Sequence, residues 1–538
     1  MRRRRRGGIP LRPGIVAGLV VIVGLVALVA VLVIRADSID SGVLPADANE
    51  ATEESRDAGP RSVEQENLLP GDDTWRIEYP ALSQEIQAYT GQASVQRGET
   101  LDLYVSTKGG GRFDAEFYRM GWYAGDGGRL VRTVRDIDGR DQGRWDPVGG
   151  LRDCATCTVD PATLLVEANW RVSYRLKVPD DWVSGVYLIK LRDQATNTSS
   201  YAIFVLRDDA SDAPALVQMA THTWQAHNNW GDANLFGSFG ADRRYAGPQR
   251  RAYRVSYDRP YDMLMGGNYG AGRFFDYEYN FVRWAESQGY AMSYTTSVDV
   301  HLRPETLLSR RLFVTVGVDE FWTKQQRDGL EAARAAGVNL AFFGAKAGHW
   351  QARMEPSTRG RDDGRVLVSY QEASLDPVSR VSPGETTSEF ARPPVNRPPS
   401  TLTGVAYGGV VSGGRTTWRA AATETWIYDR TAILPGEGFA GILGPEYDHM
   451  AVPEQRPPAL TAVGLTAVDG DGIGADTAVS AVHESESGAV VFAAGTASWS
   501  WALDDYGHAD EGAFADDRLR RVTANVIERL TLPRTVAE

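Results

Sequence analysis

Two adjacent carboxylates, Asp319 and Glu320, are the side chains of this sequence best placed to do chemistry. They follow residues 312–316, LFVTV, a short apolar run typical of a strand buried on both faces, and Gly317 permits a sharp change of direction. In open α/β sheets the carboxyl end of a strand is where ligands bind, and a carboxylate there can act as acid, base or metal ligand. We therefore predict catalytic roles for both. The alternative is that they only favour the next helix through its macrodipole.

A helix is predicted directly after these carboxylates. Thr323 followed by Gln326 is a capping-box pattern, and Gly337 suits the position just past a helix end. The helix therefore begins after Thr323, which leaves residues 319–322 in the connection from the strand.

Three other runs are dense in polar and aromatic residues: THTWQAHNNWG at 221–231, SYDRPY at 256–261 and AKAGHW at 345–350. If the strands before them are parallel, their loops converge on one polar crevice. Lys346 then joins the carboxylates as a catalytic candidate. The candidates for binding a small molecule are Asn228, Asn229, Trp230, Trp322 and Trp350.

The indoles near this rim have a second interpretation, which we favour. They can stack on a sugar or bind a cation, but they can equally pack the loops together. The residues concerned are Trp224, Trp230, Trp322, Trp350, Trp499 and Trp501.

Residues 213–538 are predicted to form an α/β domain. Apolar runs that suit strands occur at residues 215–220, 291–296, 312–316, 339–343 and 489–494, with helical patterns between them. Alternating strands and helices predict a mainly parallel sheet covered on both faces. Residues 355–400, with RPPVNRPP, suit an irregular excursion from that domain.

Residues 75–207 are predicted to form a β-sandwich domain. LDLYV at 101–105 and RVSYRLKV at 171–178 alternate between polar and apolar residues, and glycines at 109–111 and 125–128 mark turns. The acidic residues 35–74 before it suit a flexible linker.

The N-terminus predicts a membrane anchor. Residues 15–34 are uncharged and mostly Val, Leu, Ile and Ala, long enough for a transmembrane helix of roughly 30 Å. Arginines in residues 1–14 predict a cytoplasmic basic segment, which puts the bulk of the chain outside a single-pass cell-membrane protein. A secretory or twin-arginine signal is the alternative.

Charge and cysteine content fit that location. The net charge is −13, and because residues 1–35 carry seven arginines and no acid, the remainder carries −20. Such a surface argues against a nucleic-acid partner.

Cys154 and Cys157 are the only cysteines, and outside the cell they most simply form a disulfide loop. A redox CxxC is the alternative, but a thioredoxin-type context is lacking.

The runs above, with YTGQASVQRGETLDLYVST, FYRMGWYAGDGGRLV and VSGVYLIKL, resemble the N,N-dimethylformamidase large (beta) subunit family from about residue 85 onward. The resemblance implies a β-sandwich followed by an α/β domain similar to glutamine amidotransferases. It also implies hydrolysis of a C–N amide bond with a single iron, held by two tyrosines and a glutamate. Phenolate and carboxylate oxygens suit ferric iron, a Lewis acid. Homo-oligomerisation and a small partner subunit stay open.

The resemblance assigns residues of this sequence to positions of the family's motifs, and several of these residues differ from the family's. The family's GHDEYW motif falls on GVDEFW, which puts the metal-binding glutamate on Glu320 and Val318 in place of the histidine. GANA becomes GAKA, so Lys346 replaces an asparagine. AYNNWGG becomes AHNNWGD, and His227 and Phe236 stand where tyrosines are expected.

Two hypotheses for the metal site follow. In one, iron is held by Glu320 with His227, Tyr257 or Tyr261 as further ligands, since imidazole and phenolate are both good iron donors. In the other, the ammonium group of Lys346 replaces the metal cation, because an unpaired carboxylate in a closed pocket is unfavourable.

Two functions of different class are therefore expected. The first is hydrolysis of a C–N bond in a small amide, with Glu320 as ligand or acid/base. The alternative is a degenerate enzyme scaffold that binds a small molecule or a cell-envelope partner without turnover.

Overall fold

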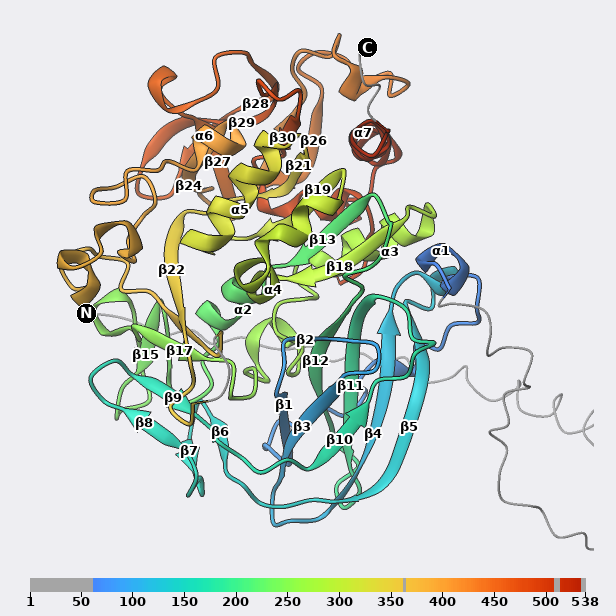
Figure 1. Ribbon diagram of the computed structural model, residues 1–538, viewed down its shortest axis with the longest axis vertical. Helices are drawn as coiled ribbons and strands as arrows, with labels where there is room; N and C mark the ends of the chain where they lie inside the picture. The colour runs from blue at the N-terminus through green and yellow to red at the C-terminus, as the bar shows by residue number, and fades with distance from the viewer. Residues whose placement is uncertain (1–60, 361–363, 508–512, 534–538) are drawn as a thin grey trace, which may run out of the picture. The chain divides into compact units, whose positions relative to one another are not determined.

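The computed structural model describes residues 61–360, 364–507 and 513–533, and it shows a mixed α/β protein with many strands and few helices (Figure 1). The described residues belong to one compact unit that spans residues 58–538. Within them, no helix is long and apolar enough to cross a membrane. The predicted basic segment 1–14, membrane helix 15–34 and most of the linker 35–74 lie outside the described residues.

Two sheets from residues 86–207 share one hydrophobic core. Leu101, Leu103 and Val105 face Phe117 and Phe204 across it, as the alternation in LDLYV predicts. The three-stranded sheet has the order β1 (Ile86–Thr90), β3 (Thr100–Thr107), β10 (Tyr174–Lys177). The five-stranded sheet has the order β2 (Ser94–Gln96), β12 (Ser199–Arg207), β11 (Gly185–Asp193), β4 (Arg112–Met120), β5 (Gly128–Asp138). The two sheets form a β-sandwich (Figure 1).

Two small hairpins extend from the sandwich. They are β6 (Arg144–Asp146) with β7 (Gly150–Arg152), and β8 (Thr158–Asp160) with β9 (Leu165–Glu167). Cys154 and Cys157 lie in the connection between these hairpins and form a disulfide, which confirms the predicted loop.

A nine-stranded sheet organises the rest of the chain. Five neighbouring strands are parallel: β18 (Met292–Thr296), β13 (Ala215–Met219), β19 (Leu312–Val318), β21 (Asn339–Ala345) and β30 (Val490–Ala493). They lie at the five predicted places, so these strand predictions are confirmed. Four further strands are antiparallel: β29 (Gly474–Glu484), β27 (Glu446–Met450), β24 (Val405–Val410) and β28 (Leu460–Gly470).

The sheet is less parallel than predicted, because its four further strands pair in the antiparallel direction. β28 and β29 are long strands joined by only three residues, and so short a connection forces antiparallel pairing. The parallel half has helical crossovers instead, and these cover both faces of the sheet.

The helices over the parallel strands pack into two separate cores. Val314 of β19 packs with α3 (Glu278–Ser287) and α7 (Asp517–Leu530), whereas Phe313 packs with α4 (Ser297–Leu302) and α5 (Lys324–Ala335). Both faces of β19 are therefore buried, as its continuous apolar sequence predicts. Shorter helices are α1 (Val63–Glu66), α2 (Thr221–His227) and α6 (Ser400–Thr403).

The helix predicted after Thr323 is confirmed. The Thr323 side chain accepts a hydrogen bond from the Gln326 backbone N–H, and Gly337, just past the end of α5, has a φ of 94°. The Gln326 side chain departs from the pattern, because it donates to Gln218 rather than to the N-cap.

Residues 319–322 are more regular than predicted. Phe321–Thr323 form β20, which pairs in parallel with β22 (Trp350–Glu355). β22 pairs in turn with β23 (Val366–Val368) and β23 with β17 (Arg254–Ser256), so the expected excursion at 355–400 contributes to a second small sheet. This sheet holds the loops after β19 and β21 together. The remaining strands are β14 (Ala233–Asn234), β15 (Gly237–Phe239), β16 (Tyr245–Ala246), β25 (Thr416–Arg419) and β26 (Gly438–Leu443).

Candidate functional site around Glu320

Glu320 and Lys346 are brought together by the pairing of two parallel strands. Val318 at the end of β19 pairs with Ala345 at the end of β21, so the residues that follow emerge side by side. Backbone hydrogen bonds continue past the strands, from the Gly348 N–H to the Asp319 carbonyl (2.9 Å) and from the Trp350 N–H to the Glu320 carbonyl (2.8 Å).

Both carboxylate oxygens of Glu320 have a polar partner. Lys346 Nζ lies 2.5 Å from Oε2, and His227 Nε2 lies 2.9 Å from Oε1. The Glu320 side chain is 1% exposed, that of Lys346 11% and that of His227 29%. The Glu320 carboxylate is therefore shielded from solvent, and the His227 imidazole is the most exposed of the three side chains.

The ion pair keeps Glu320 ionised. Burial alone would raise the pKa of this carboxyl, but the charge of Lys346 and the His227 hydrogen bond outweigh burial and hold the pKa well below its usual value. Burial would likewise lower the pKa of Lys346, but the charge of Glu320 raises it above its usual value. Each charge thus stabilises the other.

His227 is held in one tautomer. Burial and the nearby charge of Arg273 lower the pKa of this imidazole, so the ring is neutral near pH 7. Because the ionised Glu320 can only accept a hydrogen bond, Nε2 must carry the proton and Nδ1 keeps its lone pair. Phe236 stacks on the ring at a centroid distance of 4.3 Å and fixes its plane.

Lys346 sits in a turn that only some residues tolerate. Its φ is 62°, in the left-handed region, and its backbone N–H donates to Asp448 Oδ1 at 2.8 Å. The ammonium group lies 4.7 Å from the centre of the Tyr407 ring and 5.8 Å from that of Phe236. We call Glu320, His227, Lys346, Phe236 and Tyr407 the Glu320 cluster.

Asp319 points into the protein, in contrast to its neighbour. Its Oδ2 accepts hydrogen bonds from Gln218 (2.7 Å), Thr315 (3.1 Å) and the Trp322 indole (2.9 Å). Burial raises the pKa of Asp319 to about 6. These contacts give Asp319 a part in holding the strand end, and the two adjacent carboxylates do not face one common space.

Most of the proposed small-molecule contacts are engaged inside the protein. Asn228 is buried and bonds to Gln225 and the Pro260 carbonyl, Trp230 packs on Trp170 of the sandwich, and Trp322 is fully buried. Asn229 is partly buried and accepts from Asn234. Trp350 is half-buried, against His349.

The other rim indoles are buried too. Trp224 donates to Glu278, Trp499 to Thr523 and Trp501 to the Asp276 carbonyl. This burial supports the packing interpretation.

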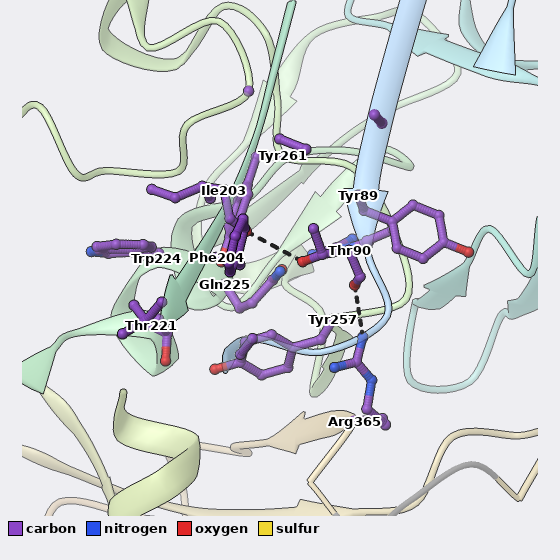
Figure 2. Close-up of a pocket in the computed structure, with 16 residues that line it drawn as sticks. Tyr89, Thr90, Ile203, Phe204, Thr221, Trp224, Gln225, Tyr257, Tyr261 and Arg365 are labelled. Carbon is purple, nitrogen blue, oxygen red and sulfur yellow. Dashed lines mark hydrogen bonds between the residues drawn. The ribbon is translucent and has the colours of Figure 1, made fainter. Parts of the chain in front are cut away.

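Tyr257 and Tyr261 lie elsewhere. They line a cavity between the sandwich and α2, together with Thr221, Trp224 and Arg365 (Figure 2). Glu320 is not among the residues that line it. The structure thus brings Glu320, His227 and Lys346 together. The two tyrosines lie instead at the cavity that Thr221 and Trp224 of α2 also line, whereas His227 is at the end of that helix.

The donor set at Glu320 does not suit ferric iron. One oxygen faces an ammonium group and the other an imidazole N–H, and a phenyl ring, which has no donor atom, stands beside them. A metal cation next to Lys346 would meet a like charge. Among the described residues, no group of three His, Cys, Asp or Glu side chains is arranged to hold a metal ion.

Sequence reasoning missed three residues from the antiparallel half. Tyr407 of β24 contacts Lys346 through its ring, Asp448 of β27 holds the Lys346 turn, and Glu446 lies near both charges, where burial raises its pKa. The one available signal was the density of acids and tyrosine in GPEYDHM at 444–450.

This β-sandwich joined to a nine-stranded mixed sheet defines a mixed α/β protein, with a Glu–Lys–His arrangement at the strand ends. The model of a family described as N,N-dimethylformamidase beta subunit-like, C-terminal, matches residues 114–512. The chain belongs to that family. None of the curated proteins searched matches the chain.

Proposed function

We propose that this dimethylformamidase-like protein binds a small polar molecule at the Glu320 cluster without iron and without turnover. The observation that carries the proposal is the 2.5 Å ion pair between Lys346 Nζ and Glu320 Oε2. The ammonium group supplies the positive charge that a buried glutamate requires. A metal is then not needed to keep Glu320 ionised.

Lysine does not replace the chemistry of a metal. A Lewis acid polarises a carbonyl and lowers the pKa of bound water, whereas this ammonium group is already committed to Glu320. The half-buried His349, Trp350 and Tyr407 around it offer aromatic surface for a small ligand instead.

A second candidate function rests on His227. Its Nε2 is held by a carboxylate, its Nδ1 keeps a lone pair, and the side chain is 29% exposed. A neutral imidazole oriented by a carboxylate is a general base. In this alternative, His227 takes a proton from a water whose oxygen attacks the carbonyl carbon of a small amide. It then gives that proton to the amide nitrogen as the C–N bond breaks, which releases a carboxylic acid and an amine.

We also propose that residues 15–34 anchor the protein in the cell membrane with most of the chain outside. The length and apolarity of that segment and the arginines before it support the proposal. Sodium carbonate extraction of membranes tests it: the full chain should stay in the pellet, and a variant lacking residues 15–34 should not.

Rebuilding the donor set tests the iron-free site. The triple variant His227→Tyr, Phe236→Tyr, Lys346→Asn restores the tyrosines and asparagine that the family resemblance places at these positions. We expect the purified wild type to be colourless and to contain less than about 0.1 iron per chain, and the variant to acquire iron and a visible tyrosinate band. Lys346→Asn alone is the matched control. Stoichiometric iron in the wild type would refute the proposal.

Turnover separates the two functions. Release of amine from a panel of small formamides and acetamides should be undetectable for the wild type, while one or more of them should bind by calorimetry. Hydrolysis that is lost in both His227→Asn and Glu320→Gln would establish the second function instead.

A further inference from the structure

A small cavity lies between the sandwich and α2, and Tyr257, Thr221 and Arg365 are among the residues that line it (Figure 2). Its volume is about 30 Å³. Because one water needs roughly 10–15 Å³ by this measure, the space suits two or three waters or one small ion. The backbone around it comes from β1 and β12 of the sandwich and from α2 of the α/β part.

Arg259, one of the residues that line this cavity, makes no direct ion pair with any described residue. Arg259 is 1% exposed, and its guanidinium group donates to the backbone carbonyls of Asn228, Trp230 and Ala233, while its Nε has no hydrogen-bond partner. In the described part of the chain, no carboxylate lies within ion-pair distance of it. Burial lowers the pKa of Arg259 to about 9, and the nearby Tyr261 and Asp262 offset only part of that effect. The side chain is still charged at pH 7.

The second arginine of the cavity is already neutralised. Arg365 bonds to Asp258 Oδ1 at 2.7 Å and donates to the Thr90 carbonyl. Arg365 is therefore paired, whereas Arg259 makes no direct ion pair within the described ranges and has only the partly offsetting charge of the nearby Asp262. An isolated buried cation is unfavourable, so a single negative charge in the cavity would stabilise the fold.

Two hydroxyl groups are available as hydrogen-bond donors. Tyr257 is 5% and Thr221 4% exposed, and the two hydroxyl groups interact with each other, while neither has another hydrogen-bond partner among the described residues. Figure 2 shows the Tyr257 hydroxyl directed toward Thr221 at the edge of the cavity. Burial raises the pKa of Tyr257 well above its usual value, so this hydroxyl keeps its proton.

We propose that this cavity binds one small monovalent anion of the size of chloride, held by Arg259 and the hydroxyl groups of Tyr257 and Thr221. The anion lies against α2, the helix that ends at His227, so it also supports the helix that presents His227 to Glu320. The proposal does not depend on whether the Glu320 cluster binds or hydrolyses a ligand.

Bromide is the probe for the site. Crystals of the protein grown or soaked in bromide should show an anomalous peak in this cavity. In solution, bromide should quench the fluorescence of Trp224, which lines the cavity, with a saturable component. The melting temperature should rise with chloride against gluconate at constant ionic strength and then level off, because the ligand binds only the folded state.

The double variant Tyr257→Phe, Thr221→Val removes both hydroxyl groups, so that neither is left without the other. We expect at least a tenfold loss of bromide affinity with an unchanged melting temperature in gluconate. Tyr79→Phe, at a 62% exposed tyrosine, is the matched control and should bind as the wild type does. Water alone in the cavity, or a melting temperature indifferent to chloride, would overturn the proposal. The wild-type measurements decide it even if the double variant fails to fold.

Discussion

The Glu320–Lys346 pair is the strongest single interaction in the candidate site, because two opposite charges are buried with little access to water. Such a pair adds little stability compared with two apolar side chains, but breaking one half leaves an uncompensated charge. Replacing either Glu320 or Lys346 alone should therefore lower the stability of the folded protein.

Lys346→Met should destabilise the protein by about 3–5 kcal/mol, because Glu320 is then buried without a cation. The double variant Glu320→Gln, Lys346→Met should recover most of that loss, since no charge remains. Urea denaturation of the four proteins in the cycle measures the coupling. A double variant no more stable than Lys346→Met would show that packing rather than charge explains the loss.

Asp448 gives a prediction in pH. Burial raises its pKa to about 7, compared with about 3.9 in an unfolded chain, so between these values the folded state binds the extra proton. The stability of the wild type relative to Asp448→Asn should therefore fall as pH rises from about 4 to about 7, by up to about 1.4 kcal/mol per pH unit, and level off above. Denaturation of both proteins at several pH values measures it. Parallel pH profiles would contradict the raised pKa.

At the scale of elements, the site depends on how closely β19 and β21 approach. A Cβ added at Gly344 would lie 1.8 Å from the Gly317 carbonyl oxygen, and one at Gly317 would lie 2.5 Å from the Cβ atom of Tyr277 and 2.7 Å from its ring. Gly317 also has a φ of 69°. Gly344 therefore lets the ends of β19 and β21 lie side by side, which places Glu320 next to Lys346, while Gly317 makes room for Tyr277.

Gly344→Ala should lower stability by more than about 3 kcal/mol, because backbone atoms cannot move aside as a flexible side chain can. Gly384→Ala is the control, since a Cβ there would meet nothing within 4 Å. Thermal unfolding of the two variants should differ by many degrees. Similar melting temperatures would mean that the strand ends are more loosely packed.

At the scale of the whole described unit, a buried ionic network joins the sandwich to the α/β part. Arg119 of β4 bonds to both oxygens of Glu286 in α3, at 2.8 and 2.9 Å, and both side chains are fully buried. Tyr294 and Asn67 also bond to Glu286, at 2.6 Å each. Asn67 lies within the predicted flexible linker 35–74, so the network ties the described end of that segment to the fold. The linker prediction is therefore wrong for residues 61–74, which include α1 and the buried Glu66.

Glu286→Gln should cost about 3–5 kcal/mol, because Arg119 loses its counter-charge in the interior. Glu528→Gln, which breaks a half-exposed ion pair with Arg521, should change stability by less than about 1 kcal/mol. Equilibrium unfolding in urea compares the two. Equal effects would mean that the network does not hold the two parts together.

Much of the fold followed from local sequence patterns. The five parallel strands, the Thr323 cap, the glycine after α5 and the disulfide were all predictable, because each depends on residues close in sequence or on a simple alternation. The closeness of Glu320 to Lys346 was also predictable, since neighbouring parallel strands end at one edge. The antiparallel half was not predicted, because β24, β27 and β29 pair although they lie far apart in the sequence.

What the sequence by itself determined is therefore the order of the elements and the edge at which polar loops gather. Only the tertiary structure decided that Asp319 turns inward while Glu320 turns to Lys346, that Tyr407 and Asp448 join from distant strands, and that Tyr257 and Tyr261 face a different cavity. The physical reason is that side-chain direction at a strand end is set by the packing of every element around it, and no short stretch of sequence contains that information.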